Sequence, residues 1–233
     1  EFSGTVPSSL CLISGLTRLN VSVNTGLTCY PSCLSSVTAL GVGDVAEGCP
    51  DAKDDAVCGF IAATDTASIA IYSQWACEVR GVPSTDPCAS GSEWTGITCS
   101  GGDVVGIDLS NKDIVGTLTA SLGGLVSLTR LNLFGNDLSG SLPAALGLLS
   151  NLRVLSLEYN ALLNGTLSSS FGSLIALDSL GLRGLDLQGS LPSSLGCLTA
   201  LTHLTLSDNS LTGTLPAFIG SMTALTKLLL SSN

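Results

Sequence analysis

Residues 128–143 read LTRLNLFGNDLSGSLP, and this stretch decides the fold because its pattern returns along the chain. A second clean copy, LTHLTLSDNSLTGTLP, spans residues 201–216. One glycine marks each copy at a nearly constant step, which is one position longer between the second and third members: Gly116, Gly140, Gly165, Gly189 and Gly213. A fixed period of this length indicates a solenoid. One coil cannot bury its own apolar face, so the fold has to be stabilised by the stacking of coils.

Each part of the repeat predicts a structural role. The leucines are expected to point inward, and each coil should contribute one short strand that pairs in parallel with the next. An asparagine where the strand turns away can hydrogen-bond backbone groups of neighbouring coils as a ladder, and it recurs as Asn24, Asn136, Asn160, Asn209 and Asn233. Lys112 and Leu185 replace it in two coils, and the coil over residues 160–165 carries one extra residue, for which we expect a local bulge and no break.

The glycine–x–leucine–proline element at residues 140–143, 189–192 and 213–216 resembles that of the plant-type leucine-rich-repeat family. The family includes receptor-kinase ectodomains, secreted polygalacturonase inhibitors and proteins of protists. The resemblance covers residues 104–233 and 1–28. It implies an α/β repeat solenoid, a right-handed spiral with a parallel β-sheet on its concave face.

Residues 51–100 differ from the repeats and resemble the disulfide-bonded N-terminal cap of the same family. They read as two short helices followed by DPCASGSEWTGITC at residues 86–99. The resemblance implies a disulfide between Cys88 and Cys99, with Trp75 and Trp94 covering the open end of the core. Cys58 and Cys77, one on each expected helix, should form a second disulfide.

The order of the segments suggests a repeating unit. Residues 1–28 read as the end of an array, 29–50 as a C-terminal cap or transition, and 101–233 as a new array of 24-residue repeats. Joined head to tail, Gly4 would follow Gly213 by one regular period, and Asn24 would follow Asn233 by the same period. We therefore expect further copies, linked in tandem or docked end to end. The alternative is a fragment of a protein with two unequal arrays.

The two ends of the chain are where such copies would meet. An unpaired strand edge is a template for another chain, and soluble solenoids normally carry polar caps. The predicted contact involves Glu1 and Phe2 at one end, and Leu228, Leu230 and Asn233 at the other.

The composition of the chain limits which partners and which compartment are possible. The net charge is −10 with only 8 Lys and Arg among 233 residues, which excludes a phosphate-backbone partner. No apolar stretch reaches the roughly 18 residues of a membrane span. Nine cysteines without a zinc pattern favour disulfides in an oxidising compartment, so we expect a secreted or cell-surface protein.

Cysteine connectivity beyond the cap stays open. Cys29 and Cys33 can pair with each other or with Cys11 and Cys49, because spacing alone does not decide connectivity. Nine is odd, so one thiol is unpaired or bonds another chain. Cys197, in an otherwise regular coil, is the candidate for a free buried thiol.

Candidate sites are few. Asn20 and Asn164 begin N-x-[ST] sequons and are predicted glycosylation sites. Phe134, Arg153, Tyr159 and Arg183 fall at variable positions of the concave face, where this family usually binds partners. Their residue types favour a binding patch, and the alternative is a solvated strand face without a ligand.

No motif supports catalysis, a cofactor or a metal. His203 has no nucleophile or acid at motif spacing and is read as a surface residue. The acidic run at Asp51, Asp54 and Asp55 fits a helix N-terminal turn better than a calcium loop. The sequence therefore favours a non-enzymatic structural unit that assembles end to end into a glycosylated filament or appendage. The alternatives are a receptor-like or adhesion ectodomain that binds a protein or glycan ligand, and a secreted enzyme inhibitor.

Overall fold

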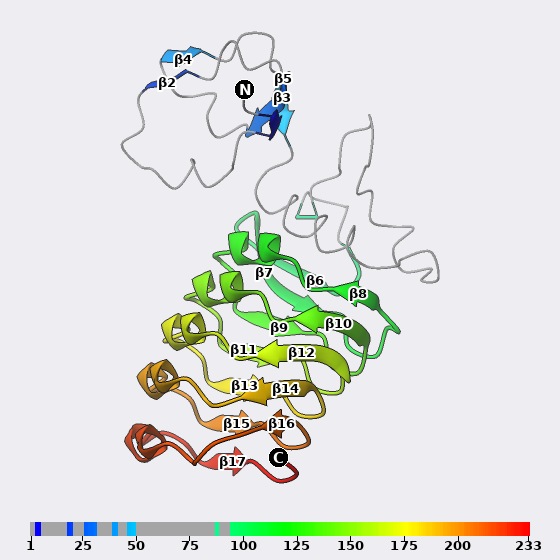
Figure 1. Cartoon of the computed structure of the whole chain (residues 1–233). Helices are drawn as coiled ribbons and strands as arrows, with labels where there is room; N and C mark the ends of the chain where they lie inside the picture. The colour runs from blue at the N-terminus through cyan, green and yellow to red at the C-terminus, as the bar shows by residue number, and fades with distance from the viewer. Residues whose placement is uncertain are drawn as a thin grey trace.

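A computed structural model describes residues 87–88 and 94–233 with their side chains, and the backbone of five strands within residues 3–49. Residues 94–233 form a spiral of stacked coils in which each regular coil runs through a strand, a second strand and a 3-10 turn (Figure 1). Strands from successive coils pair in parallel and build two sheets. This is the expected leucine-rich-repeat solenoid.

The first sheet has seven strands in the order β17-β15-β13-β11-β9-β7-β6 and forms the concave face. Its members are β6 (Ile97–Ser100), β7 (Asp103–Asp108), β9 (Arg130–Asn132), β11 (Val154–Ser156), β13 (Ser179–Gly181), β15 (His203–Thr205) and β17 (Lys227–Leu229). From β7 onward all pairs are parallel, and each leucine at a strand centre pairs with the next, as Leu131 does with Leu155 and Leu180 with Leu204. The parallel sheet was predicted correctly.

The first strand of this sheet differs from the rest because β6 pairs antiparallel with β7. The two strands form a hairpin in which Ser100 lies opposite Asp103, so only Gly101 and Gly102 make the turn. Both glycines have positive φ, 62° and 86°, as a two-residue primed turn requires. This hairpin was not predicted from the sequence, although the Gly-Gly pair is its signal.

A second parallel sheet, which was not predicted from the sequence, runs along the side of the spiral. It contains β8 (Val115–Thr117), β10 (Asp137–Ser141), β12 (Leu162–Thr166), β14 (Asp186–Gly189) and β16 (Ser210–Leu211). The repeat glycine of each copy lies in or beside these strands. Its φ is 81° at Gly140 and 74° at Gly189. A residue with a side chain rarely adopts this φ, which explains the glycine at every copy.

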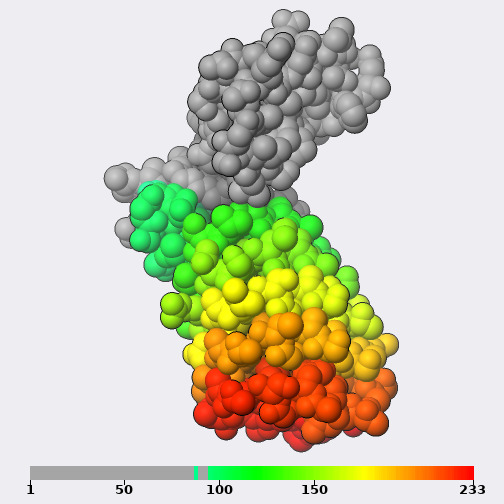
Figure 2. All heavy atoms as spheres, turned by 90° about the vertical axis from the view of Figure 1, so that its left-hand side faces the viewer, coloured from blue at the N-terminus to red at the C-terminus, as the bar shows by residue number. Residues whose placement is uncertain are grey.

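The convex side is built from short 3-10 turns. These are η5 (Ala120–Gly124), η6 (Ala144–Leu148), η7 (Ser169–Ser173), η8 (Ser193–Cys197) and η9 (Ala217–Ser221). Figure 2 looks onto the side of these turns and shows the coils as successive bands from green to red. In η5, η6 and η7 one glycine lies against the next coil: a Cβ on Gly123 would come within 2.5 Å of the Ala145 carbonyl oxygen, and one on Gly147 within 2.4 Å of that of Ser170.

The core is aliphatic and continuous through the stack. Leu131, Leu133, Leu138 and Leu146 of one coil are fully buried, and the same positions are occupied by leucine, isoleucine or phenylalanine in the neighbouring coils. Trp94 is buried at the start of the core, as the cap resemblance implied. Among the described residues no helix is long and apolar enough to cross a membrane.

Within residues 3–49 the described backbone also forms parallel strands. Two of them, β2 (Arg18–Asn20) and β4 (Ala39–Gly41), pair with each other. The others form a three-stranded sheet in the order β1-β3-β5, from β1 (Ser3–Thr5), β3 (Gly26–Pro31) and β5 (Ala46–Cys49). The segment predicted as a cap or transition, residues 29–50, thus adds strands in parallel to those of the preceding segment.

Candidate concave binding face

The asparagine ladder supports the concave sheet from behind. The side-chain amide of Asn160 donates to the carbonyl oxygens of Leu133 and Leu157 at 2.9 and 2.8 Å, and its oxygen accepts from the Leu138 amide at 3.1 Å. Asn136, Asn209 and Asn233 make the equivalent bonds in their coils. Asn24 lies outside the described residues. The ladder thus fixes the ends of the strands that carry the candidate face.

The coil with the extra residue stays in the stack. The paired residues Ser139 and Leu162 are separated in sequence by one position more than the paired residues Val115 and Asp137. Pairing continues without interruption into β14, so the insertion is absorbed as one step of register. Leu185, which replaces the ladder asparagine one coil later, is buried as part of the core.

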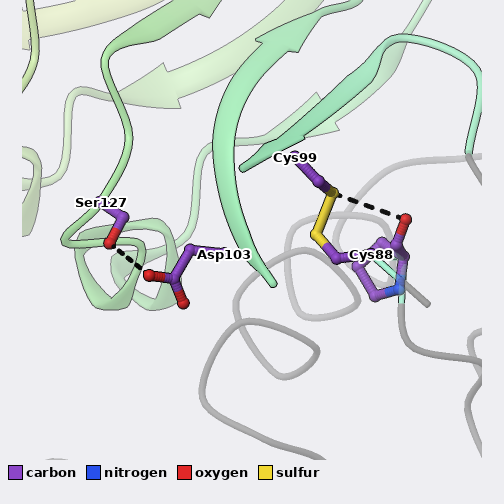
Figure 3. The surroundings of a disulfide bond; sticks show 5 residues. Cys88, Cys99, Asp103 and Ser127 are labelled. Carbon is purple, nitrogen blue, oxygen red and sulfur yellow. Dashed lines mark hydrogen bonds between the residues drawn. A yellow bond between two sulfur atoms is a disulfide. The ribbon is translucent and has the colours of Figure 1, made fainter. Parts of the chain in front are cut away.

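The disulfide between Cys88 and Cys99 links the segment before the sheet to β6 (Figure 3). The Cα atoms are 5.6 Å apart, and the Cys99 sulfur lies 3.6 Å from the Pro87 carbonyl oxygen. Close by, the Ser127 hydroxyl donates to the Asp103 carboxylate at 3.0 Å, which joins β7 to the next coil. Cys58, Cys77 and Trp75 lie outside the described residues.

Cys197 has a free thiol, but the prediction that it is buried is wrong. It occupies the last residue of η8, directly after Gly196, and faces solvent. The equivalent residue of η6, Leu148, is 64% exposed. This position of the turn points away from the core in both coils, so its residue type is free to vary.

The candidate patch at the C-terminal end of the concave strands is a contact cluster. The rings of Phe134 and Tyr159 meet edge to face with centroids 5.2 Å apart. The Arg183 guanidinium lies 5.4 Å from the Tyr159 ring centroid and donates to the Asp208 carboxylate at 2.7 Å. Tyr159 is 44% exposed. We call Phe134, Tyr159 and Arg183 the aromatic cluster.

Arg153, the fourth predicted member, does not join the aromatic cluster. It directly precedes β11, whereas Tyr159 follows the same strand, so the two lie toward opposite ends of a parallel strand. Asp208 was not predicted as a member. Its signal was available in the sequence, because it follows β15 much as Arg183 follows β13.

The ion pair between Arg183 and Asp208 shifts the pKa of both groups. The hydrogen bond to Asp208 raises the pKa of Arg183, and the same bond lowers the pKa of Asp208.

A second group of polar side chains lies on β7 and β9. The side-chain amide of Asn132 donates to both Asp108 carboxylate oxygens at 3.0 Å, and the Arg130 guanidinium lies 3.5 Å from the same carboxylate. Burial raises the pKa of Asp108, but these bonds and the Ser110 hydroxyl outweigh it, so the pKa is lowered.

The remaining predicted site residues are placed as follows. Asn164 is exposed on β12, and its amide donates to the Leu162 carbonyl at 3.3 Å. Asn20 lies in β2, Cys29 in β3 and Cys49 in β5, while Cys11 and Cys33 lie outside the described residues. His203 is exposed on β15 with its ring nitrogen 2.7 Å from the Thr202 hydroxyl. Asp51, Asp54 and Asp55 lie outside the described residues.

The predicted assembly ends are described on one side only. Glu1 and Phe2 lie outside the described residues. β17 is the outermost described strand of the concave sheet, and Leu228 and Leu230 are half-buried, whereas Leu204 and Leu206 one coil earlier are fully buried. Asn233 is exposed and makes the same bonds as the other ladder asparagines.

No group of three or more His, Cys, Asp or Glu side chains arranged to hold a metal ion occurs among residues 87–88 and 94–233. The described concave face presents aromatic rings, the Arg130–Asp108 and Arg183–Asp208 ion pairs, and hydroxyl groups.

The two-sheet spiral with its asparagine ladder defines the chain as a leucine-rich-repeat protein. The Leucine Rich Repeat family model matches residues 127–149, 151–174 and 200–222. More particularly, the repeats are of the type found in plant receptor-kinase ectodomains, which are its structural neighbours. A search of curated protein sequences found no match.

Three solved structures illustrate the similarity. PEPR1 in its complex with AtPEP1 is 29% identical with a TM-score of 0.68, and the match covers 76% of this chain and 24% of that one. A chain of the BIR3–SERK2 complex from Arabidopsis thaliana is 29% identical with a TM-score of 0.61, over 70% of this chain and 85% of that one. The Arabidopsis receptor kinase HAESA, bound to the peptide hormone IDA and the co-receptor SERK1, is 29% identical with a TM-score of 0.55, over 78% and 33%. This chain thus spans about a quarter of the length of the PEPR1 chain.

Proposed function

We propose that this chain is a recognition module of an extracellular protein, whose concave face binds a peptide or protein and carries out no covalent chemistry. The observation that carries the proposal is the placement of scarce residue types. Aromatic residues make up only 4% of the chain, yet Phe134 and Tyr159 touch each other on the concave surface. Tyrosine and arginine are enriched at binding hot spots, and Arg183 completes the cluster.

The comparisons support the same function. HAESA was solved with the peptide hormone IDA and the co-receptor SERK1, PEPR1 with AtPEP1, and BIR3 with SERK2. The disulfide between Cys88 and Cys99 supports an oxidising compartment, hence a location outside the cell. Exposure of Asn164 supports the predicted glycosylation there.

The proposal is tested by panning a phage-displayed library of random dodecapeptides on the purified chain. We expect selected peptides to lose binding to Tyr159→Ala and Arg183→Ala, because both substitutions remove exposed contact groups. The matched control is Leu148→Ala, an exposed residue on the convex side, which should bind as the unchanged chain does. Selected peptides that bind all three variants equally would place recognition elsewhere and contradict the proposal.

A second candidate function is end-to-end assembly into a filament. It is supported by the register match between residues 233 and 1 and by the parallel pairing of β1 with β3 and of β2 with β4. Sedimentation of the purified chain over a range of concentrations tests it: we expect association that grows with concentration. A monomer at every concentration would contradict docking between separate chains.

A further inference from the structure

The coil with the extra residue exposes a large apolar side chain on the second sheet. Leu162, in β12, is 58% exposed, and it lies three residues before the repeat glycine. The other coils carry a polar residue at this position: Asp113, Asp137, Asp186 and Ser210. Side chains of a strand point alternately to its two sides, and Leu163 is buried between the exposed Leu162 and Asn164. Leu162 and Asn164 therefore project from the same side of the sheet.

The nitrogen atom to which a glycan would be attached lies beside this leucine. Asn164 begins the sequon at residues 164–166, and residues 94–233 contain no other. Its side-chain nitrogen, Nδ2, donates to the Leu162 carbonyl oxygen at 3.3 Å. The amide is thus turned back toward residue 162, so a sugar on Nδ2 would begin next to the exposed leucine.

We propose that Asn164 carries an N-linked glycan whose first sugar covers the Leu162 side chain. The inference rests on the extracellular location in the proposed function and deepens it by giving the glycan a structural role. A pyranose ring presents C–H groups on one face, so packing that face on Leu162 removes apolar surface from water. The hydroxyl groups of the sugar stay in solvent.

The attachment reaction leaves the hydrogen bond to Leu162 in place. Nδ2 of Asn164 forms a bond to the anomeric carbon of an oligosaccharide, and the bond from that carbon to the diphosphate of its lipid-linked donor breaks. The donor leaves as a lipid diphosphate, and Nδ2 releases one of its two hydrogens as a proton. The other hydrogen remains and can donate to the Leu162 carbonyl oxygen, which holds the glycosylated amide in the same orientation.

The test uses the whole chain, secreted from a eukaryotic cell line that glycosylates sequons. Mass spectrometry of the peptide that contains Asn164 should show the added sugar. Thr166→Ala removes the sequon, and its thermal unfolding midpoint should lie about 2 °C or more below that of Thr117→Ala. Thr117→Ala is the matched control because the methyl groups of both threonines lie against the repeat glycine of the next coil, while Thr117 belongs to no sequon.

Two further variants separate the covering of Leu162 from the mere presence of a glycan. In the Leu162→Ser background, Thr166→Ala should lower the midpoint no more than Thr117→Ala does, because no apolar side chain is left to cover. Gln188→Asn creates a sequon at residues 188–190 of the next coil, where the residue two positions earlier is Asp186. Added to Thr166→Ala, it should supply a glycan without restoring the midpoint.

The outcomes distinguish this inference from the proposed function. An unmodified Asn164 would overturn the inference, and so would a glycan whose removal lowers the midpoint equally with and without Leu162→Ser. Either result leaves the proposed function standing if selected peptides still lose binding to Tyr159→Ala. Peptide binding that ignores Tyr159→Ala, in a chain that shows the effect of the glycan, would overturn the proposed function alone.

Discussion

At two neighbouring junctions between coils, the equivalent backbone amide is hydrogen-bonded in different ways. At the junction of coils that ends at Asn160, the amide of Leu138 donates to the Asn160 side chain at 3.1 Å. One coil later the ladder residue is Leu185, which has no acceptor. There the equivalent amide, that of Leu163, donates to the carbonyl oxygen of Asn160 at 2.9 Å. The residue inserted between Asn160 and Leu163 makes this tight turn possible.

The extra residue in the coil over residues 160–165 and the leucine at position 185 are therefore linked, because the first offsets the loss of the asparagine at the second. A buried amide without an acceptor is costly, so the loss of an asparagine at residue 185 has to be offset. The inserted residue brings a backbone carbonyl into reach and thereby replaces the side-chain oxygen. On the concave side, the Glu158–Thr205 hydrogen bond spans the same coil and links its two neighbours.

The largest effect is expected where the ladder is intact. Asn160→Ala removes the ladder hydrogen bonds and leaves buried backbone groups without partners, so the free energy of unfolding should fall by about 3 kcal/mol or more. Urea unfolding followed by circular dichroism measures the change. Asn151→Ala, which removes one bond from an exposed asparagine, is the control and should change stability by less than about 1 kcal/mol. Equal losses in the two variants would contradict the role of the ladder.

A deletion tests whether the two departures compensate each other. Removing the exposed Leu162 restores the standard spacing but takes the Asn160 carbonyl away from the Leu163 amide, at a cost of about 1–3 kcal/mol. Adding Leu185→Asn to the deletion should recover most of that loss, whereas Leu185→Asn alone should not stabilise the chain. The double-mutant cycle measures the coupling. Additive effects would show that the insertion and Leu185 are unrelated.

A smaller effect is expected from the bond that spans the Leu185 coil on the concave side. Thr205→Val keeps the shape of the side chain and removes the hydroxyl that donates to Glu158, so stability should fall by about 1–2 kcal/mol. Thermal unfolding measures it. Thr226→Val, just before β17, is the comparison, because the Thr226 hydroxyl is exposed and bonds only a backbone carbonyl. A larger loss from Thr226→Val would contradict the linking role of Thr205.

The smallest effect concerns the exposed ion pair between Arg183 and Asp208. The pKa of Asp208 is lowered in the folded chain, so its contribution is present above its unfolded pKa, about 4, and is lost as the pH falls through the folded pKa. Unfolding curves of the unchanged chain and of Asp208→Asn should therefore differ slightly at neutral pH and converge in acid. A difference that persists at the lowest pH would exclude the ion pair as its source.

The repeat itself could be predicted because its period is written in the leucines, the asparagines and the glycine at each copy. The contacts of Phe134 with Tyr159 follow from the same logic, since residues one coil apart occupy neighbouring positions. The second sheet was missed because its strands lie within the stretch that was read only as a turn. The turn before Leu163 could not be foreseen, because it depends on which amide loses its acceptor in three dimensions. The exposure of Cys197 depends in the same way on the direction of one turn.

The glycines of the 3-10 turns have a consequence for the whole solenoid. At Gly123, Gly147 and Gly172 a single methyl group would collide with the next coil, so these positions hold the outer edges of the coils close together. The spacing at the outer edge relative to that of the strands determines how strongly the solenoid bends. The curvature of the concave surface is thus controlled from the opposite side of the protein, by glycines of the convex turns.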